Sequence, residues 1–328
     1  MGGQPREIRI LARGDVSKPT DLVGPGTVPF IPGVPYRFDL PPGHTESDRR
    51  IALADWVVHP ENPLTWRSIV NRVWLYHFGR GLCDSPNDFG RMGQLPSHPE
   101  LLDWLAAEFR DSGGSLKDLH RLIMRSAVYR QRSDHRDDYA AIDGSNQYLW
   151  RMNRRKLEAE AIRDSVLFVA GKLRTEMGGP GFQDFVIEKP EHSPHYQYHK
   201  FDPDDPAGHR RAIYRFTVRS QPQPFMDTLD CADPSQLVDK RNETLTALQA
   251  LALLNNKFVV RMAEHLAARA AAEHPGDPAA QIRSAFRRCL SRDPSAEDVA
   301  AFTRYAETYG MPNACRVIFN LNEMNFVD

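Results

Sequence analysis

The chain of 328 residues lacks long apolar runs, paired cysteine motifs and glycine-rich phosphate motifs. No apolar run approaches the roughly 18 residues that a membrane helix needs, so we expect no membrane span. The first residues, MGGQPREIRI, lack the apolar region of a secretory signal. There is no C-x-x-C-H haem attachment site, so we expect this chain to bind no haem of its own.

The chain also lacks an excess of either charge, because 42 Lys and Arg nearly balance 43 Asp and Glu. A net charge of −1 gives no basic field, so we expect no nucleic-acid partner. The 41% hydrophobic and 26% charged composition is that of a soluble globular protein. No G-x-S-x-G elbow is present, and Asp88-Phe89-Gly90 has neither a glycine-rich loop nor a His-Arg-Asp loop before it. These absences exclude an α/β-hydrolase and a kinase.

The cysteines leave two interpretations open. Cys83, Cys231, Cys289 and Cys315 are widely spaced. In an oxidising compartment they would allow two disulfides in three possible pairings. In a reducing compartment they would be small core residues.

Helical periodicity dominates the chain and predicts a mainly α fold: one large helical domain with minor β and a long irregular insertion rich in Pro and His. Four segments follow: an extended N-terminal wrapping segment over 1–46, a helical core over 47–175, the insertion over 176–240, and C-terminal helices over 241–328 packing on the same core. Strands are predicted at about 8–12 and, within the insertion, at 211–219. The predicted helices span about 48–58, 63–79, 99–112, 116–129, 153–173, 244–272 with a break at Asn255-Asn256, 279–290, 296–309 and 313–324.

The helix over 63–79 is apolar on nearly every side, yet it carries Arg67, Asn71, Arg72 and His77. Buried charge must be paired or hydrogen-bonded. These residues are therefore predicted to belong to an internal polar network, which is either a structural strut or the wall of a site.

Two sets of residues are candidates for catalysis or for a metal. Glu158 and Asp164 lie in NRRKLEAEAIRD, where carboxylates could do acid/base work or hold a cation, or could form an ion-pair ladder. His77, His98 and His120 lie at or near helix ends and could meet on a metal, or could each bond a backbone carbonyl. His120 joins the two carboxylates as a catalytic candidate.

The insertion carries two further candidates. His192, His195 and His199, followed by Asp202, Asp204 and Asp205, are dense in metal ligands, although a polar surface loop explains them equally. The interleaved Tyr196, Tyr198 and Phe201 could instead stack on sugar rings. A second set suits an anion or a carboxylate, or tethers the loop by salt bridges: Arg215, Arg219, Asp227, Asp230 and Arg241.

Five ordered blocks carry a family resemblance: NPLTWRSIVNRVWLYHFGRGL, DFGRMGQLPSHPELLDWLA, LKDLHRLIMRSAVYRQ, RRKLEAEAIRD and KRNETLTALQALALLNNKFV. They resemble the PSD-type domain of unknown function, typically the C-terminal part of planctomycetal cytochrome-c-associated proteins. ARGD near the start and NLNEMNFVD at the end resemble that family's outer blocks. The resemblance implies an exported protein with a c-type cytochrome domain upstream, and it implies no specific activity.

The sequence thus predicts an extracytoplasmic accessory module with a polar cleft that binds carbohydrate or another polar ligand. The cleft is drawn from Arg72, His77, His98, His120, Glu158 and Asp164, and Arg155 and Arg219 are added as ligand-binding candidates. One alternative is a hydrolase or lyase acting on polysaccharide through Glu158 and Asp164 or a histidine-bound divalent metal. The other is a docking platform for the cytochrome domain, without a small-molecule site.

Overall fold

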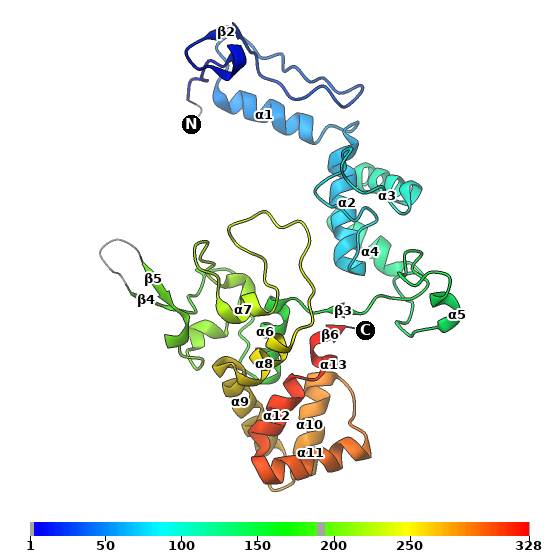
Figure 1. Ribbon diagram of the computed structural model, residues 1–328, viewed down its shortest axis with the longest axis vertical. Helices are drawn as coiled ribbons and strands as arrows, with labels where there is room; N and C mark the ends of the chain where they lie inside the picture. The colour runs from blue at the N-terminus through cyan, green and yellow to red at the C-terminus, as the bar shows by residue number, and fades with distance from the viewer. Residues whose placement is uncertain (1–2, 189–193, 328) are drawn as a thin grey trace. The chain divides into compact units, whose positions relative to one another are not determined.

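A computed structural model describes residues 3–188 and 194–327, and its contacts divide the chain into two compact units (Figure 1). Unit 1 ends at Asn153 and unit 2 begins at Arg154. The described residues form thirteen α-helices and six short strands, which confirms the predicted mainly α class with minor β. Each unit has a hydrophobic cluster of its own.

Unit 1 contains a strand pair and five helices. They are β1 (Arg9–Leu11), β2 (Pro19–Leu22), α1 (Glu46–Val57), α2 (Pro63–Phe78), α3 (Pro99–Asp111), α4 (Leu116–Arg125) and α5 (Asp137–Ala140), with a 3-10 turn at Ala12–Gly14. β1 and β2 are antiparallel, and β1 falls inside the strand predicted over 8–12. Thr45 and Asp48 close a capping box at the start of α1.

Helix α2 is the centre of the core of unit 1. The Asn62 side chain accepts a hydrogen bond from the amide of Leu64, Pro63 occupies the first turn, and Gly79 ends the helix with φ 75°. Its buried face meets α3 and α4 in one cluster: Val70, Val73, Trp74, Phe78, Leu82, Leu102, Leu105, Phe109, Leu119 and Ile123. The helix predicted from the apolar pattern is confirmed almost to the residue.

In unit 1 the start of α3 agrees with the prediction and the end of α4 does not. The N-cap of α3 is His98, and the Ser97 hydroxyl donates to the Leu82 carbonyl. Helix α4 ends at Arg125 rather than near residue 129. Ser126 is extended there, with ψ 151°, and its hydroxyl donates back to the Ile123 carbonyl.

Unit 2 contains eight helices and two small strand pairs. They are β3 (Arg155–Lys156), α6 (Ala159–Val169), β4 (Val186–Glu188), β5 (His195–Gln197), α7 (Pro224–Thr228), α8 (Ala247–Asn255), α9 (Lys257–Glu273), α10 (Pro278–Leu290), α11 (Ala296–Tyr309), α12 (Met311–Phe319), α13 (Asn322–Asn325) and β6 (Phe326–Val327). Short 3-10 turns occur at Tyr198–Lys200, Pro206–His209 and Ala212–Tyr214. β3 pairs with β6, and β4 with β5, both antiparallel.

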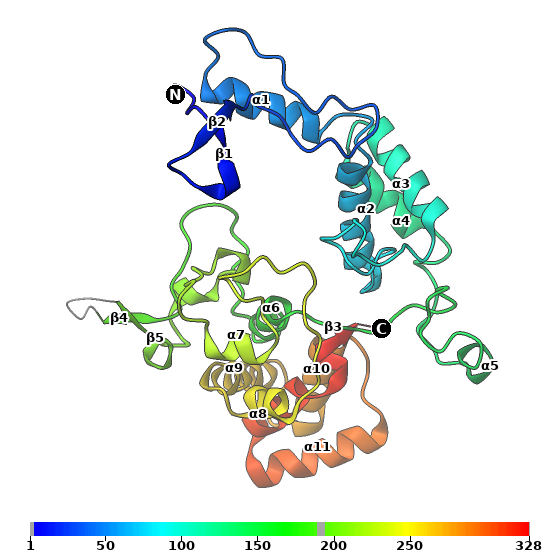
Figure 2. The ribbon, with the colours of Figure 1, turned by 45° about the horizontal axis from the view of Figure 1, so that its top comes forward.

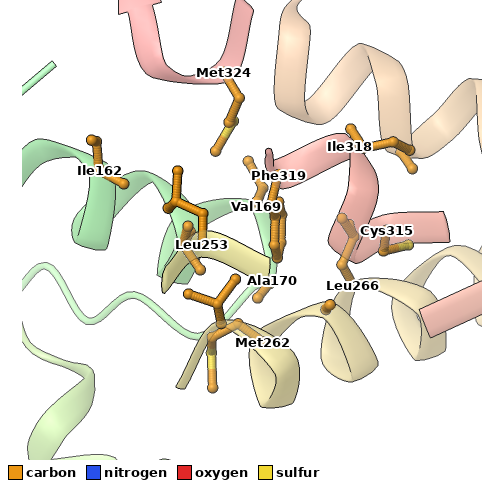
Figure 3. Close-up of a cluster of buried hydrophobic side chains, with 14 of the residues drawn as sticks. Ile162, Val169, Ala170, Leu253, Met262, Leu266, Cys315, Ile318, Phe319 and Met324 are labelled. Carbon is orange, nitrogen blue, oxygen red and sulfur yellow. The ribbon is translucent and has the colours of Figure 1, made fainter. Parts of the chain in front are cut away.

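The core of unit 2 lies between α6, α8, α9, α10 and α12. Helices α9, α10 and α12 lie side by side in both views (Figures 1 and 2). Phe319 and Ile318 of α12 meet Leu266 and Met262 of α9, and Ile162 of α6 lies in the same cluster (Figure 3). All five side chains are at most 1% exposed. The predicted break of the long helix at Asn255-Asn256 is confirmed, because the Asn256 side chain caps α9.

In unit 2 one predicted helix is shorter than expected and one predicted strand is wrong. The helix predicted over 153–173 is only Ala159–Val169, since Arg155 and Lys156 pair with β6 and the amide of Leu157 donates to the Asn325 carbonyl. The strand predicted over 211–219 is a 3-10 turn followed by a single bridge to Phe182. Periodicity failed in both places because long-range backbone pairing decides the conformation.

The predicted helical core over 47–175 contributes α1 to α5 to unit 1 and β3 with α6 to unit 2. The C-terminal helices share their cluster with α6. Among the helices of residues 3–188 and 194–327, none combines the length and apolar character that crossing a bilayer requires.

Replacing Leu266 by Ala tests the core of unit 2. Leu266 is 0% exposed, so the free energy of unfolding should fall by about 3 kcal/mol. Leu248→Ala is the matched control, because Leu248 is 69% exposed and the change should stay within about 0.5 kcal/mol. Urea unfolding followed by circular dichroism measures both, and equal losses would contradict the placement of α9.

Candidate functional site

The polar side chains of α2 reach separate partners instead of one internal network, so that prediction is wrong. Arg67 pairs with Asp103 at 2.5 Å, and Arg72 donates to the Asn87 side chain at 2.6 Å. Both arginines are half-buried, so one side-chain partner together with solvent is enough to satisfy the charge of each guanidinium.

Asn71 is the fully buried polar residue of α2, and it holds the following loop. Its amide nitrogen donates to the Cys83 carbonyl at 2.8 Å, and its oxygen accepts from the Cys83 amide at 2.8 Å. The fit is tight, because a Cβ on Gly81 would lie 2.4 Å from the Cys83 carbonyl oxygen. The loop after α2 is therefore held at a fixed place beside the helix.

That loop forms one wall of a groove in unit 1, and the start of α2 forms the other. The groove has a volume of about 710 Å³ and is lined by Phe30, Leu64, Thr65, Ser68, Pro86, Asn87, Asp88, Phe89 and Gly90. Its lining combines apolar and aromatic surface with a few hydroxyl, amide and carboxylate groups. This combination is typical of small-ligand sites.

The polar groups of the groove are held in place. Arg72 orients the Asn87 side chain, and the Asp88 side chain accepts from the Gly90 amide at 2.8 Å. Phe30 is 55% exposed and meets Trp56 edge-on, with ring centroids 6.3 Å apart. Because the lining holds one carboxylate and no Lys or Arg, it suits a neutral or weakly cationic ligand. Arg72, one of the predicted ligand-binding residues, contacts this lining through Asn87.

His77, His98 and His120 divide into a pair and a single residue. His77 Nε2 and His120 Nδ1 are 2.8 Å apart, whereas His98 contacts the Ser97 hydroxyl at 2.9 Å and the ring of Tyr148 edge-on. Within residues 3–188 and 194–327 there is no group of three or more His, Cys, Asp or Glu placed to hold a metal.

Two of the predicted metal-ligand histidines of the insertion are exposed: His195 lies on β5, and His199 lies on the 3-10 turn that follows it. His192 falls outside the described residues. Tyr196 and Tyr198 pack edge-on against Phe185, with centroids 5.0 and 5.4 Å away. Both tyrosines are therefore part of a small aromatic cluster and do not form an open stacking surface for sugar rings.

The predicted catalytic carboxylates lie in unit 2, whereas His120 lies in unit 1. Glu158 is the N-cap residue of α6 and is half-buried. Asp164 accepts from the amide of Ala212 at 2.8 Å and pairs with Arg163 at 3.3 Å. Burial raises the pKa of Asp164 above its usual value, although these bonds oppose the shift.

Arg163 connects α6 to the insertion. It is 5% exposed, donates to the carbonyls of Arg210 and Gly208, and lies over the Phe182 ring with its guanidinium carbon 4.9 Å from the centroid. Burial lowers the pKa of Arg163, and Asp164 opposes that shift. These contacts give Arg163 and Asp164 a role as a strut that holds residues 208–212.

A second buried group of charges surrounds Asp184. Burial raises the pKa of this carboxyl, and the nearby Arg215 and Arg163 oppose the rise. Burial, aided by the charge of Asp184, raises the pKa of Tyr198 to about 12. Arg215 also lines a cavity of about 20 Å³ with Cys231 and Asp227 among its neighbours, which has room for one water molecule. This space is too small for the anion or carboxylate ligand predicted for Arg215.

The remaining predicted residues are dispersed. Arg219 is exposed, Arg155 is half-buried on β3, and Arg241 pairs with Glu160 at 3.0 Å. All four cysteines are free thiols. Burial raises the pKa of the Cys289 thiol and raises that of Cys315 to about 12, as expected of core residues.

A buried polar centre of unit 2 joins Asp230, which the sequence placed in the set that could tether the insertion by salt bridges, to Lys156, which the sequence did not single out. The Lys156 ammonium, whose side chain is 7% exposed, donates to Asp230 at 2.7 Å, to the Thr244 carbonyl at 2.9 Å and to Gln249 at 3.0 Å. Asp230 also accepts from Thr244 and Gln249, and it has φ 68°. The groove of unit 1 was missed as well, although Pro86-Asn87-Asp88 is a turn signal that could have drawn attention to the loop.

A comparison with family models identifies the family. The PSD1 model, described as a protein of unknown function (DUF1553), matches residues 49–306. The chain belongs to this family. The match to PSD1 spans parts of both units and confirms the predicted resemblance. No curated protein and no solved structure matches the chain.

Replacing Asp230 by Asn tests the polar centre. The change leaves Lys156 buried without a counter-charge, so the free energy of unfolding at pH 7 should fall by about 3 kcal/mol. The control is Glu297→Gln, which removes an exposed carboxylate of the same unit. It should change the free energy of unfolding by less than about 0.5 kcal/mol. Equal effects in chemical unfolding would contradict the role of Asp230.

The same pair predicts a dependence on pH. Burial raises the pKa of Asp230, but the bonds from Lys156, Thr244 and Gln249 outweigh burial and hold the pKa below its usual value. A lowered pKa contributes stability that is present above the unfolded value of about 3.9 and is lost as the pH falls through the folded value. The stability difference between wild type and Asp230→Asn should therefore shrink from pH 7 to pH 3. A difference that stays constant in urea titrations over this range would refute the ion pair.

Proposed function

We propose that the chain is an extracytoplasmic accessory module that binds a neutral carbohydrate in the groove of unit 1. The observation that carries the proposal is the lining of that groove. It offers Phe30 and Phe89 as apolar ring faces, and Thr65, Ser68 and Asn87 as hydrogen-bonding groups. Sugar rings present apolar C–H faces and hydroxyl edges, so both kinds of surface would be used. The extracytoplasmic setting rests on the family resemblance.

The charges of the chain support a neutral ligand over an anionic one. Arg72, the cation that contacts the lining, is engaged by Asn87, and Asp88 is the only charged member of the lining. A sulfated or uronic polysaccharide would bring its negative charge close to the Asp88 carboxylate. Like charges in a partly buried groove repel each other, so binding should favour neutral chains.

Binding can be tested with the full chain and soluble neutral polysaccharides: β-glucan, xylan, mannan and galactan. Affinity electrophoresis and calorimetry should show binding of at least one of them. Phe30→Ala and Asn87→Ala should weaken it about tenfold or more, because each removes a direct contact. Phe168→Ala, which removes an exposed ring in unit 2, should leave binding unchanged. Binding that survives both groove changes would sink the proposal.

In the enzyme alternative, the chain is a hydrolase or a lyase that cleaves polysaccharide. Glu158 and Asp164 would carry the reaction, together with His120 or a divalent metal. A raised pKa, as in Asp164, is a property of general acids. However, Asp164 is engaged by Ala212 and Arg163, which favours the structural role. Release of reducing ends from any of the same polysaccharides, abolished by Asp164→Asn in a folded protein, would establish the enzyme instead.

The docking alternative has one specific observation in its favour. Helix α8 leaves Leu248 and Leu251 exposed by 69% and 52%, and Leu245 before it is 74% exposed. Exposed apolar groups of this kind are typical of interaction surfaces. If a c-type cytochrome domain binds here, Leu248→Lys with Leu251→Lys should abolish its co-elution with the chain in gel filtration.

A further inference from the structure

The end of α2 and the middle of α4 bring two imidazole rings together in unit 1, outside the groove. His77 Nε2 and His120 Nδ1 are 2.8 Å apart, and the ring centroids are 5.0 Å apart. In this contact one ring nitrogen donates its proton and the other accepts it with its lone pair. The two nitrogens thus face each other across a hydrogen bond, and neutral imidazole nitrogens are ligands that transition metals prefer.

The two rings are held in this arrangement by the core. Both come from helices that contribute to one hydrophobic cluster, through Phe78 next to His77 and Leu119 next to His120. Tyr129 packs edge-on against the His77 ring, with centroids 5.2 Å apart and an interplanar angle of 87°. His77 is half-buried and His120 is exposed. The pair is therefore preorganised on one side and open to solvent on the other.

We propose that His77 and His120 together bind a transition metal ion of the Zn²⁺ type. A tetrahedral ion with Zn–N distances of about 2.0–2.1 Å separates two such nitrogens by about 3.3 Å. To bind the ion, the exposed His120 side chain rotates so that both lone pairs point at the metal and the nitrogens move apart from 2.8 Å to this separation. The ring that donates the proton moves it to its other nitrogen, so that both facing nitrogens offer lone pairs. Water completes the coordination.

The surrounding charges do not oppose a cation strongly. Arg121 follows His120 and pairs with Asp118, while Arg80 follows α2 and lies 3.6 Å from Asp84. These two arginines, which lie close to the histidines in sequence, each have a carboxylate beside them, and Lys117, three residues before His120 on α4, is a further cation. A site with two protein ligands and open positions exchanges its metal readily, unlike the closed four-ligand sites of structural zinc.

The test is a titration of the purified full chain, stripped with chelator, with ZnCl₂ and separately with MgCl₂. Calorimetry should show one Zn²⁺ site and none for Mg²⁺, which prefers oxygen ligands. X-ray absorption of the zinc-loaded protein should show two nitrogen ligands at about 2.0–2.1 Å. Absence of zinc binding would overturn the proposal.

His120→Ala is the decisive variant, because an exposed side chain can be removed without disturbing the fold. Zn²⁺ affinity should fall at least about tenfold, as it does when even outer-shell partners of a metal are lost. His135→Ala is the control, since His135 is an exposed histidine of unit 1 that lies beside Asp137. His77→Ala should lower the Zn²⁺ affinity by the same factor as His120→Ala. Unchanged affinity in His120→Ala, or an equal loss in His135→Ala, would overturn the proposal.

Discussion

The ion pair between Lys156 and Asp230 is the constraint on which unit 2 depends most. A buried ammonium is costly unless every proton has an acceptor, and Lys156 meets this demand with Asp230, the Thr244 carbonyl and Gln249. These partners come from α8 and from the irregular stretch before it. One side chain of β3 therefore holds partners that lie 74, 88 and 93 residues away from it in sequence. Arg163 does the same for residues 208–212 through two backbone carbonyls.

This constraint changes how the charged residues of the family motifs are interpreted. The segment RRKLEAEAIRD resembles an active-site motif because it is dense in arginines and carboxylates. In the structure Lys156, Glu160, Arg163 and Asp164 all reach partners in the insertion or in the segment before α8. A long irregular stretch has few backbone partners of its own, so side chains from β3 and α6 supply them. The dense charge of this segment is thus explained by fold maintenance.

Sequence patterns predicted the helices well and the site poorly, for a physical reason. The stripe of α2 and the caps at Asn62 and Asn256 are local features, which the chain specifies within a few residues. The conformation of Arg155-Lys156 depends on β6, more than 150 residues away, and no local pattern encodes that pairing. The groove depends on Phe30 meeting the loop at Asn87, and the histidine pair on α2 meeting α4. Such contacts between distant residues become visible only in three dimensions.

The charges of β3 and α6 in unit 2 maintain structure, and we propose that the groove of unit 1 binds the ligand. Hydrogen–deuterium exchange of the full chain, with and without the neutral polysaccharide that binds best, tests this separation of roles most directly. We expect added protection over residues 63–68 and 86–90, which line the groove, and unchanged exchange over residues 156–164. Protection centred on residues 156–164, with none at the groove, would contradict the account and make the carboxylates of α6 the binding or catalytic site.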